Sequence, residues 1–244
     1  MKVAACLISV FLVLLTNCVL ASDATPGFKI ESLAERVYLH TSYKNIKGYG
    51  VLDSNGLIVL DGKDAYLIDT PWSETDTEKL LSWIDENNFS LKASVSTHWH
   101  DDRTAGIALL NKKQIPTYAS MLTNQSLQTR GKPKAMHTFD ATHYSLLPNK
   151  IEIFYPGPGH SEDNIVVWLP HQKILFGGCL LRALAWTSPG NLSDANLDEW
   201  AHTVNKIKER YKDIDLVVPG HGNVTNAQIL DHTINVVEAA RKKR

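Results

Sequence analysis

Residues 97–103 constrain the fold of this 244-residue chain more than any other segment. They place His98, His100 and Asp102 at alternate positions directly after a strand-like run, residues 93–96. Alternating side chains at the end of a strand can point into one cleft, so all three can meet there. Neutral imidazole together with carboxylate is a common ligand set for zinc. The segment therefore predicts a metal site at the end of a strand.

One such segment supplies three ligands at most, so the site needs partners from elsewhere in the chain. Three later segments each place a single His or Cys after an apolar, strand-like run, and in each case the residue directly follows a glycine. These residues are His160, Cys179 and His221. A metal site that includes them requires the ends of several strands to meet at one edge.

Composition and charge favour a globular enzyme. The chain is 43% hydrophobic with a formal net charge of −1, and its length is sufficient for one sizeable core. Charged residues are interspersed except for the basic residues 241–244, which are typical of a solvated helix end. This distribution argues against nucleic-acid binding.

The first 21 residues have the pattern of a secretory signal peptide. Lys2 precedes an apolar stretch, residues 3–15. Residues 19–21 then have the small or aliphatic side chains that a signal peptidase recognises just before its cleavage site. We expect cleavage after Ala21 and a mature single domain of residues 22–244. A membrane anchor is disfavoured because Asn17 interrupts a run that is already short for a bilayer. A lipoprotein signal is a further alternative, but Asn17 fits it poorly.

Signal cleavage would remove Cys6 and Cys18 and leave Cys179 as the single cysteine of the mature chain. A lone thiol in an oxidising compartment must be buried or bound. Because Gly177 and Gly178 leave room beside it, we favour a metal thiolate over a buried packing residue.

The first half of the chain is predicted to begin with an antiparallel meander. Asn55-Gly56 and Asp61-Gly62 favour tight hairpin turns between its strands. Residues 42–49, which include Tyr49, are either a mobile flap over the site or an ordinary hairpin. The strands expected in this half are residues 37–41, 50–52, 57–60, 65–68, 93–96 and 117–119, with helices at 73–87 and after Thr104.

The second half loosely repeats this order of strands followed by helices. Asn196 and Glu199 are spaced as a capping pair for an amphipathic helix through Tyr211, and a second helix follows around Leu230. The strands expected here are residues 144–147, 151–155, 164–169, 174–176 and 216–218. This order predicts an α/β fold of two packed sheets with helices on both outer faces, and the site at the edge where the halves meet.

Six residues, in this order and of these kinds, resemble the ligands of the metallo-β-lactamase family, specifically its two-zinc subclass with a Cys ligand (B1-like): His98, His100, Asp102, His160, Cys179 and His221. Residues 67–72, 155–164 and 190–196 also resemble the family, and the similarity extends from about residue 30 to the C-terminus. The resemblance implies a four-layer αββα sandwich.

The resemblance also implies the ligand sets and the reaction. His98, His100 and His160 would hold one zinc, and the second Zn²⁺ would be held by Asp102, Cys179 and His221. A metal-activated hydroxide would attack the β-lactam carbonyl. Asn191 and the first zinc would polarise the carbonyl oxygen, while the second zinc, held by the catalytic Asp102, would stabilise the charge left on nitrogen.

Two positions depart from the usual family pattern. Arg182 stands where many relatives have a Lys that binds the substrate carboxylate; it keeps the charge but has a longer, planar head. Some relatives bind the second zinc with oxygen and nitrogen ligands alone, and these have a His where this chain has Arg103. Without that His, the second zinc site of this chain must rely on Cys179. Arg103 is then expected to be a cation near the thiolate that stabilises its charge. Trp186 and Tyr49 are further candidates for substrate contact.

The resemblance therefore implies a zinc β-lactamase that hydrolyses penicillins, cephalosporins and carbapenems and confers antibiotic resistance. The signal pattern predicts a periplasmic location, and we expect a monomer because the sequence has no coiled-coil or repeat pattern. No nucleic-acid partner and no stable membrane association are expected. A thioester or lactone hydrolase of the same fold is the nearest alternative, opposed by the signal segment, Cys179 and Arg103. A zinc protein without turnover is opposed by three-His ligation, because structural zinc sites are usually closed by four protein ligands.

Overall fold

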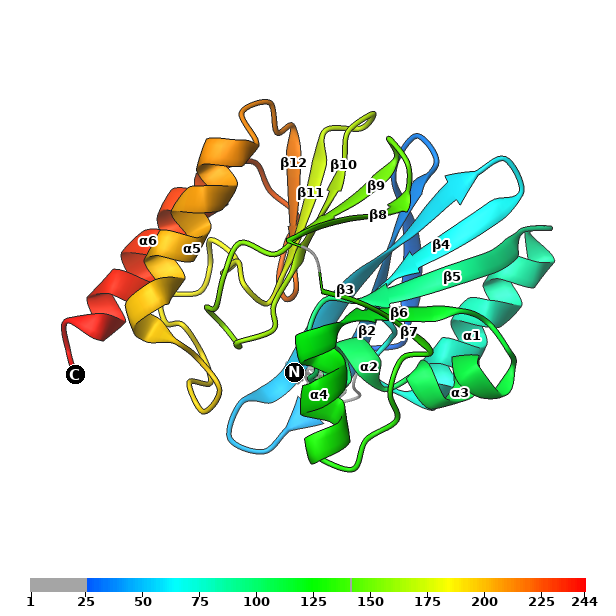
Figure 1. The fold of residues 1–244 in the computed structure, drawn as a ribbon, viewed down its shortest axis with the longest axis horizontal. Coiled ribbons are helices and arrows are strands. Elements are labelled where there is room, and N and C mark those ends of the chain that lie inside the picture. Colours follow the sequence, from blue (N-terminus) through cyan, green and yellow to red (C-terminus); the bar gives the residue numbers. More distant parts are fainter. Residues whose placement is uncertain (1–25, 141) are drawn as a thin grey trace, which may run out of the picture.

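Two β-sheets face each other in the computed structural model, with helices on their outer sides (Figure 1). The structure describes residues 26–140 and 142–244, so the expected signal segment, residues 1–21, lies outside the described residues. No helix within this described part is long and apolar enough to cross a bilayer.

The first sheet has seven strands in sequence order. Its first four strands are antiparallel, and the last four pair in parallel. The strands are β1 (Lys29–Ala34), β2 (Val37–Ile46), β3 (Gly50–Asp61), β4 (Asp64–Ile68), β5 (Ser90–Ser96), β6 (Thr117–Ser120) and β7 (His137–Phe139).

The second sheet has five strands in the order β12-β11-β10-β9-β8. Only its β11–β12 pair is parallel. The strands are β8 (His143–Leu147), β9 (Ile151–Phe154), β10 (Val166–Leu169), β11 (Ile174–Gly178) and β12 (Leu216–Pro219).

Helices cover both sheets and close the four layers. The sheets pack through buried residues such as Val95 and Phe176, while Leu80 and Trp200 anchor helices to the outer faces. As predicted, Asn196 caps its helix, accepting from the Glu199 N–H at 3.2 Å. The helices are α1 (Glu74–Glu86), α2 (Asp101–Thr104), α3 (Ile107–Lys112), α4 (Met121–Thr129), α5 (Leu197–Arg210) and α6 (Gln228–Arg241).

One turn prediction is wrong: Asn55-Gly56 lies inside the continuous strand β3. Asn55 is buried there, and its Nδ2 donates to Gly222 O at 2.7 Å, so its side chain serves a distant loop instead of a turn. Gly56 is needed for close packing, because a Cβ at this position would lie 2.2 Å from His40 Nε2. As a result β2 and β3 form one long hairpin, paired up to Ile46 and Gly50, with Tyr49 near its tip.

Helix α4 was not predicted from the sequence because it carries little apolar periodicity. Its buried residues are Thr123, Asn124 and Leu127, two of which are polar. Tertiary hydrogen bonds hold it in place, since Asn124 exchanges two bonds with the Ala135 backbone.

Candidate metal centre

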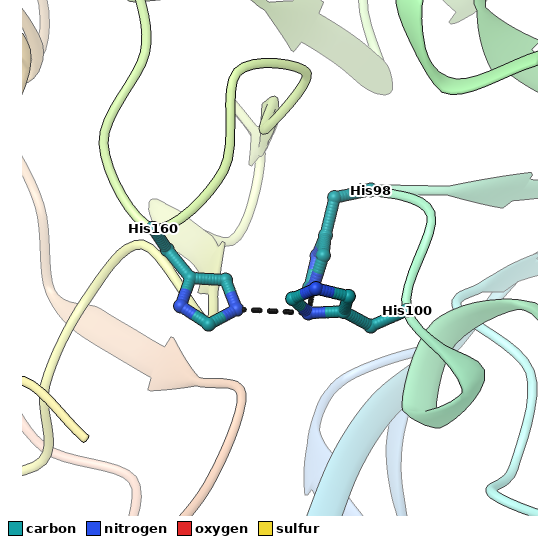
Figure 2. Close-up of side chains that lie close together, drawn as sticks. All are labelled: His98, His100 and His160. Atoms are coloured by element: carbon teal, nitrogen blue, oxygen red, sulfur yellow. Dashed lines mark hydrogen bonds between the residues drawn. The ribbon is translucent and has the colours of Figure 1, made fainter. Parts of the chain in front are cut away.

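Three imidazoles converge at the edge of the sandwich (Figure 2). His98 Nε2 lies 2.9 Å from His100 Nδ1, which lies 3.1 Å from His160 Nε2. In a tetrahedral zinc site with Zn–N distances near 2.0 Å, ligand nitrogens are about 3.3 Å apart. The spacing therefore fits three ligands around one metal ion.

Local structure explains why these rings meet. The chain leaves β5 before His98 and turns into α2 directly after His100. The loop that carries His160 is closed by Asn164, which accepts from the Ser161 N–H and donates to Gly157 O. Segments 60 residues apart in sequence are thus held at one edge.

The electrostatics around His98 and His160 favour the form of the ring that binds metal. Burial and the neighbouring imidazoles lower the pKa of His98 and of His160 well below the usual range. Neutral imidazole is the ligand form. On its outer side, His100 Nε2 lies 3.1 Å from Asp194 Oδ2, a carboxylate that can accept a proton from Nε2 and leave Nδ1 to face the metal.

A second group lies beside the first and contains Asp102, Cys179 and His221. Asp102 Oδ2, Cys179 Sγ and His221 Nε2 are each 3.2 Å from the other two atoms. These side chains come from the start of α2 and from the ends of β11 and β12. The ligand atoms of His98, Asp102 and Cys179 also lie within 4.8 Å of one another, so the two groups adjoin.

Arg103 is fully buried behind the second group, as the predicted cation near the thiolate. Its Nη2 lies 3.2 Å from Cys179 Sγ, and its Nε donates to Asp102 Oδ2 at 3.0 Å. Nη1 also lies 3.3 Å from the buried carboxylate of Asp69. Burial raises the pKa of Asp102, but Arg103 and His221 outweigh it and hold that pKa well below the usual range.

His221 turns one ring nitrogen toward the other members of the second group. Burial lowers its pKa, yet Cys179 and Asp102 outweigh burial and raise the pKa to about 10. The opposite ring nitrogen, Nδ1, donates to Asp53 O, so Nε2 is the atom turned toward Asp102 and Cys179. A cysteine sulfur, a carboxylate and an imidazole at these distances are a donor set that suits zinc.

Both groups open into a cavity of about 440 Å³. The substrate-contact candidates from the sequence, Tyr49, Arg182, Trp186 and Asn191, all line it. Arg182 is only 4% exposed, and its Cζ lies over the ring of Trp186, 4.4 Å from the ring centre. Its Nη2 has no hydrogen-bond partner in the described part of the chain. Asn191 accepts from the Ser193 N–H at 3.0 Å, so its amide nitrogen is the end left for a ligand.

Sequence reasoning missed several residues of this cavity. Asp194 lies within the family-like segment 190–196, but no spacing connects it with His100. Trp72 and Trp99 flank the candidate ligands, and only their tertiary position shows that they form cavity walls.

Comparison with known proteins decides the family. No protein-family model matches the chain. The metallo-beta-lactamase type 2 of Pseudomonas aeruginosa is 47% identical over 213 residues, which cover 87% of this chain and 85% of the relative. The chain belongs to the metallo-β-lactamase family. The metallo-beta-lactamase type 2 of Bacteroides fragilis is 39% identical over 213 residues, covering 85% of this chain and 84% of the relative.

Solved metallo-β-lactamase structures share the fold. TMB-1 superposes with a TM-score of 0.87 at 44% identity, covering 88% of this chain and 99% of that chain. The DIM-1 metallo-beta-lactamase superposes with a TM-score of 0.88 at 45% identity, covering 89% of this chain and 100% of the DIM-1 chain. The predicted family, its Cys-containing subclass and the two-sheet α/β sandwich are therefore confirmed. As a metallo-β-lactamase, the chain is a metal-binding hydrolase.

Proposed function

We propose that this metallo-β-lactamase is a two-zinc enzyme that opens the β-lactam ring of penicillins, cephalosporins and carbapenems and so confers resistance. The observation that carries the proposal is the pair of adjoining ligand groups in a cavity that also holds a buried arginine. The names and the identity of the metallo-beta-lactamase type 2 relatives support this reaction class.

The residues present fit two zinc ions. His98, His100 and His160 would hold one, and the other would be bound by Asp102, Cys179 and His221. Zinc bound there would supply Lewis-acid chemistry, polarising the amide carbonyl and activating the attacking water.

The chain's own residues would bind and orient the substrate. The guanidinium of Arg182, whose buried Nη2 has no hydrogen-bond partner among residues 26–140 and 142–244, would pair with the carboxylate beside the ring nitrogen. Its contact with the ring of Trp186 would hold the plane of the guanidinium. The amide nitrogen of Asn191 would donate to the carbonyl oxygen as charge develops there. Asp194 would hold the ring of His100 in its productive orientation.

We also infer that residues 22–244 act as one exported, monomeric domain in the periplasm. The signal-like pattern of residues 1–21 supports export, and the joint site of the two sheets supports a single domain.

Hydrolysis assays on the mature protein test the function. A chromogenic cephalosporin, a penicillin and a carbapenem are offered with and without a zinc chelator, alongside metal counting. We expect all three rings to be opened, about two zinc ions per chain, and loss of activity on chelation. Two bound zinc ions without ring opening would instead favour a thioester or lactone hydrolase, and activity that survives metal removal would exclude the proposed mechanism.

A further inference from the structure

A smaller cavity of about 280 Å³ adjoins the main one. The two cavities share the side chains of Lys44, Trp72, Asp101 and Lys132. A substrate group could therefore extend from the main cavity into the smaller one without leaving the protein surface. We call this smaller cavity the side cavity.

The side cavity carries more positive than negative charge. Lys132 Nζ bonds Asp101 Oδ1 at 2.6 Å and also lies 4.9 Å from the ring centre of Trp99. Lys44 lies 5.8 Å from the ring centre of Trp72 and, within the described residues, has no carboxylate at ion-pair distance. Two ammonium groups thus face one carboxylate, which leaves a net positive charge for a ligand to balance.

The position of Arg182 indicates which end of a substrate reaches the side cavity. Arg182 lines the main cavity but not the side cavity, and its loop belongs to the second half of the chain. The side cavity is built from first-half segments, among them β2 and α2. A bicyclic β-lactam carries its carboxylate beside the ring nitrogen and its acyl side chain beside the carbonyl, at opposite ends. With its carboxylate on Arg182, its acyl side chain would extend toward Lys44 and Lys132.

We propose that the side cavity is a subsite for a negatively charged acyl side chain, bound by Lys44 and Lys132 and packed against Trp72. This inference rests on the proposed function. It makes substrates with an anionic acyl group the preferred class among otherwise equal β-lactams.

The test compares benzylpenicillin with its α-carboxy derivative, which differ only by a carboxylate on the acyl side chain. The quantity measured is the ratio of kcat/KM for the derivative to kcat/KM for benzylpenicillin. Lys44→Gln and Lys132→Gln should each lower this ratio by about threefold, and the double variant should lower it by about tenfold. These decreases should be smaller at high salt, because salt screens the charges.

Two further variants are controls. Lys132→Arg keeps the positive charge and should retain the ratio. Lys112→Gln on α3, which lines neither cavity, is the charge-matched control and should also leave the ratio unchanged.

Removing a negative charge from the side cavity should have the opposite effect on the ratio. Asp101→Asn removes the carboxylate that competes for Lys132, so it should raise the ratio. If the lysine variants slow both penicillins equally, the lysines serve the shared ring carboxylate and the subsite is wrong. An unchanged ratio in the double variant also overturns the inference, whereas failure of the wild-type protein to open benzylpenicillin would overturn the proposed function itself.

Discussion

Cys179 is the residue that most distinguishes the second ligand group from the first. We expect Cys179→Ser to weaken binding of the second zinc and to lower turnover on the order of 100-fold, because a hydroxyl replaces a soft thiolate ligand. Metal counting and benzylpenicillin kinetics measure both effects. One zinc should remain at the three histidines, and circular dichroism should show a retained fold. Unchanged turnover would remove Cys179 from the mechanism.

His40 connects stability to pH at the scale of a single side chain. It is buried, donates from Nε2 to Asp69 O at 3.0 Å, and leaves its buried Nδ1 without a partner among the described residues. Burial lowers its pKa from 6.5 to about 4. Because the unfolded chain binds the proton more tightly, the His40 contribution is complete above pH 6.5 and is lost as the pH falls toward 4.

We therefore expect His40→Gln to flatten the acid side of the stability profile. Between pH 7 and pH 5 the free energy of unfolding should fall in both proteins. The fall should be about 2 kcal/mol larger in the wild type than in the variant. Urea unfolding of chelated protein measures this difference without interference from metal release. Parallel profiles for the two proteins would contradict the assignment.

Strand β3 continues through Gly56 without a turn. Because Gly56 lies within the strand, Gly56→Ala would place a methyl group 2.2 Å from His40 Nε2 and 2.6 Å from Ile68 O. We expect overpacking to lower the free energy of unfolding by about 1–3 kcal/mol. Urea unfolding at pH 7 measures it, and Gly27→Ala, with no atom within 4 Å of the new carbon, is the matched control. Equal stability of both variants would contradict this packing.

The sequence predicted elements well where one local signal was sufficient. Residues 73–87 contain α1 with its Ser73 cap, and the Asn196 cap begins α5 as expected. In β3, by contrast, the local turn preference of Asn55-Gly56 is outweighed by contacts with the loop after β12. Helix α4 had too weak a local pattern to be recognised.

At the scale of the whole molecule, both ligand groups join the two sheets. His98 follows β5 of the first sheet, whereas Cys179 and His221 follow strands of the second. Bound metal should therefore stabilise the packed sandwich relative to the unfolded chain. We expect a chelator to lower Tm by roughly 10 °C, and Cys179→Ser to show a smaller decrease because it starts with less metal. Differential scanning calorimetry measures both shifts, and equal Tm values with and without chelator would contradict metal bridging.

The sequence by itself determined the kinds and order of the candidate ligands, the α/β class and the family resemblance. These follow from side-chain chemistry and from patterns that repeat over a few residues. The sequence also predicted a cation, Arg103, near Cys179. Only the tertiary structure decided that Asp194 supports His100 and that Lys44 and Lys132 share a cavity. The physical reason is range: these residues are 94 and 88 positions apart in the sequence, and sheet packing, not local preference, brings them together.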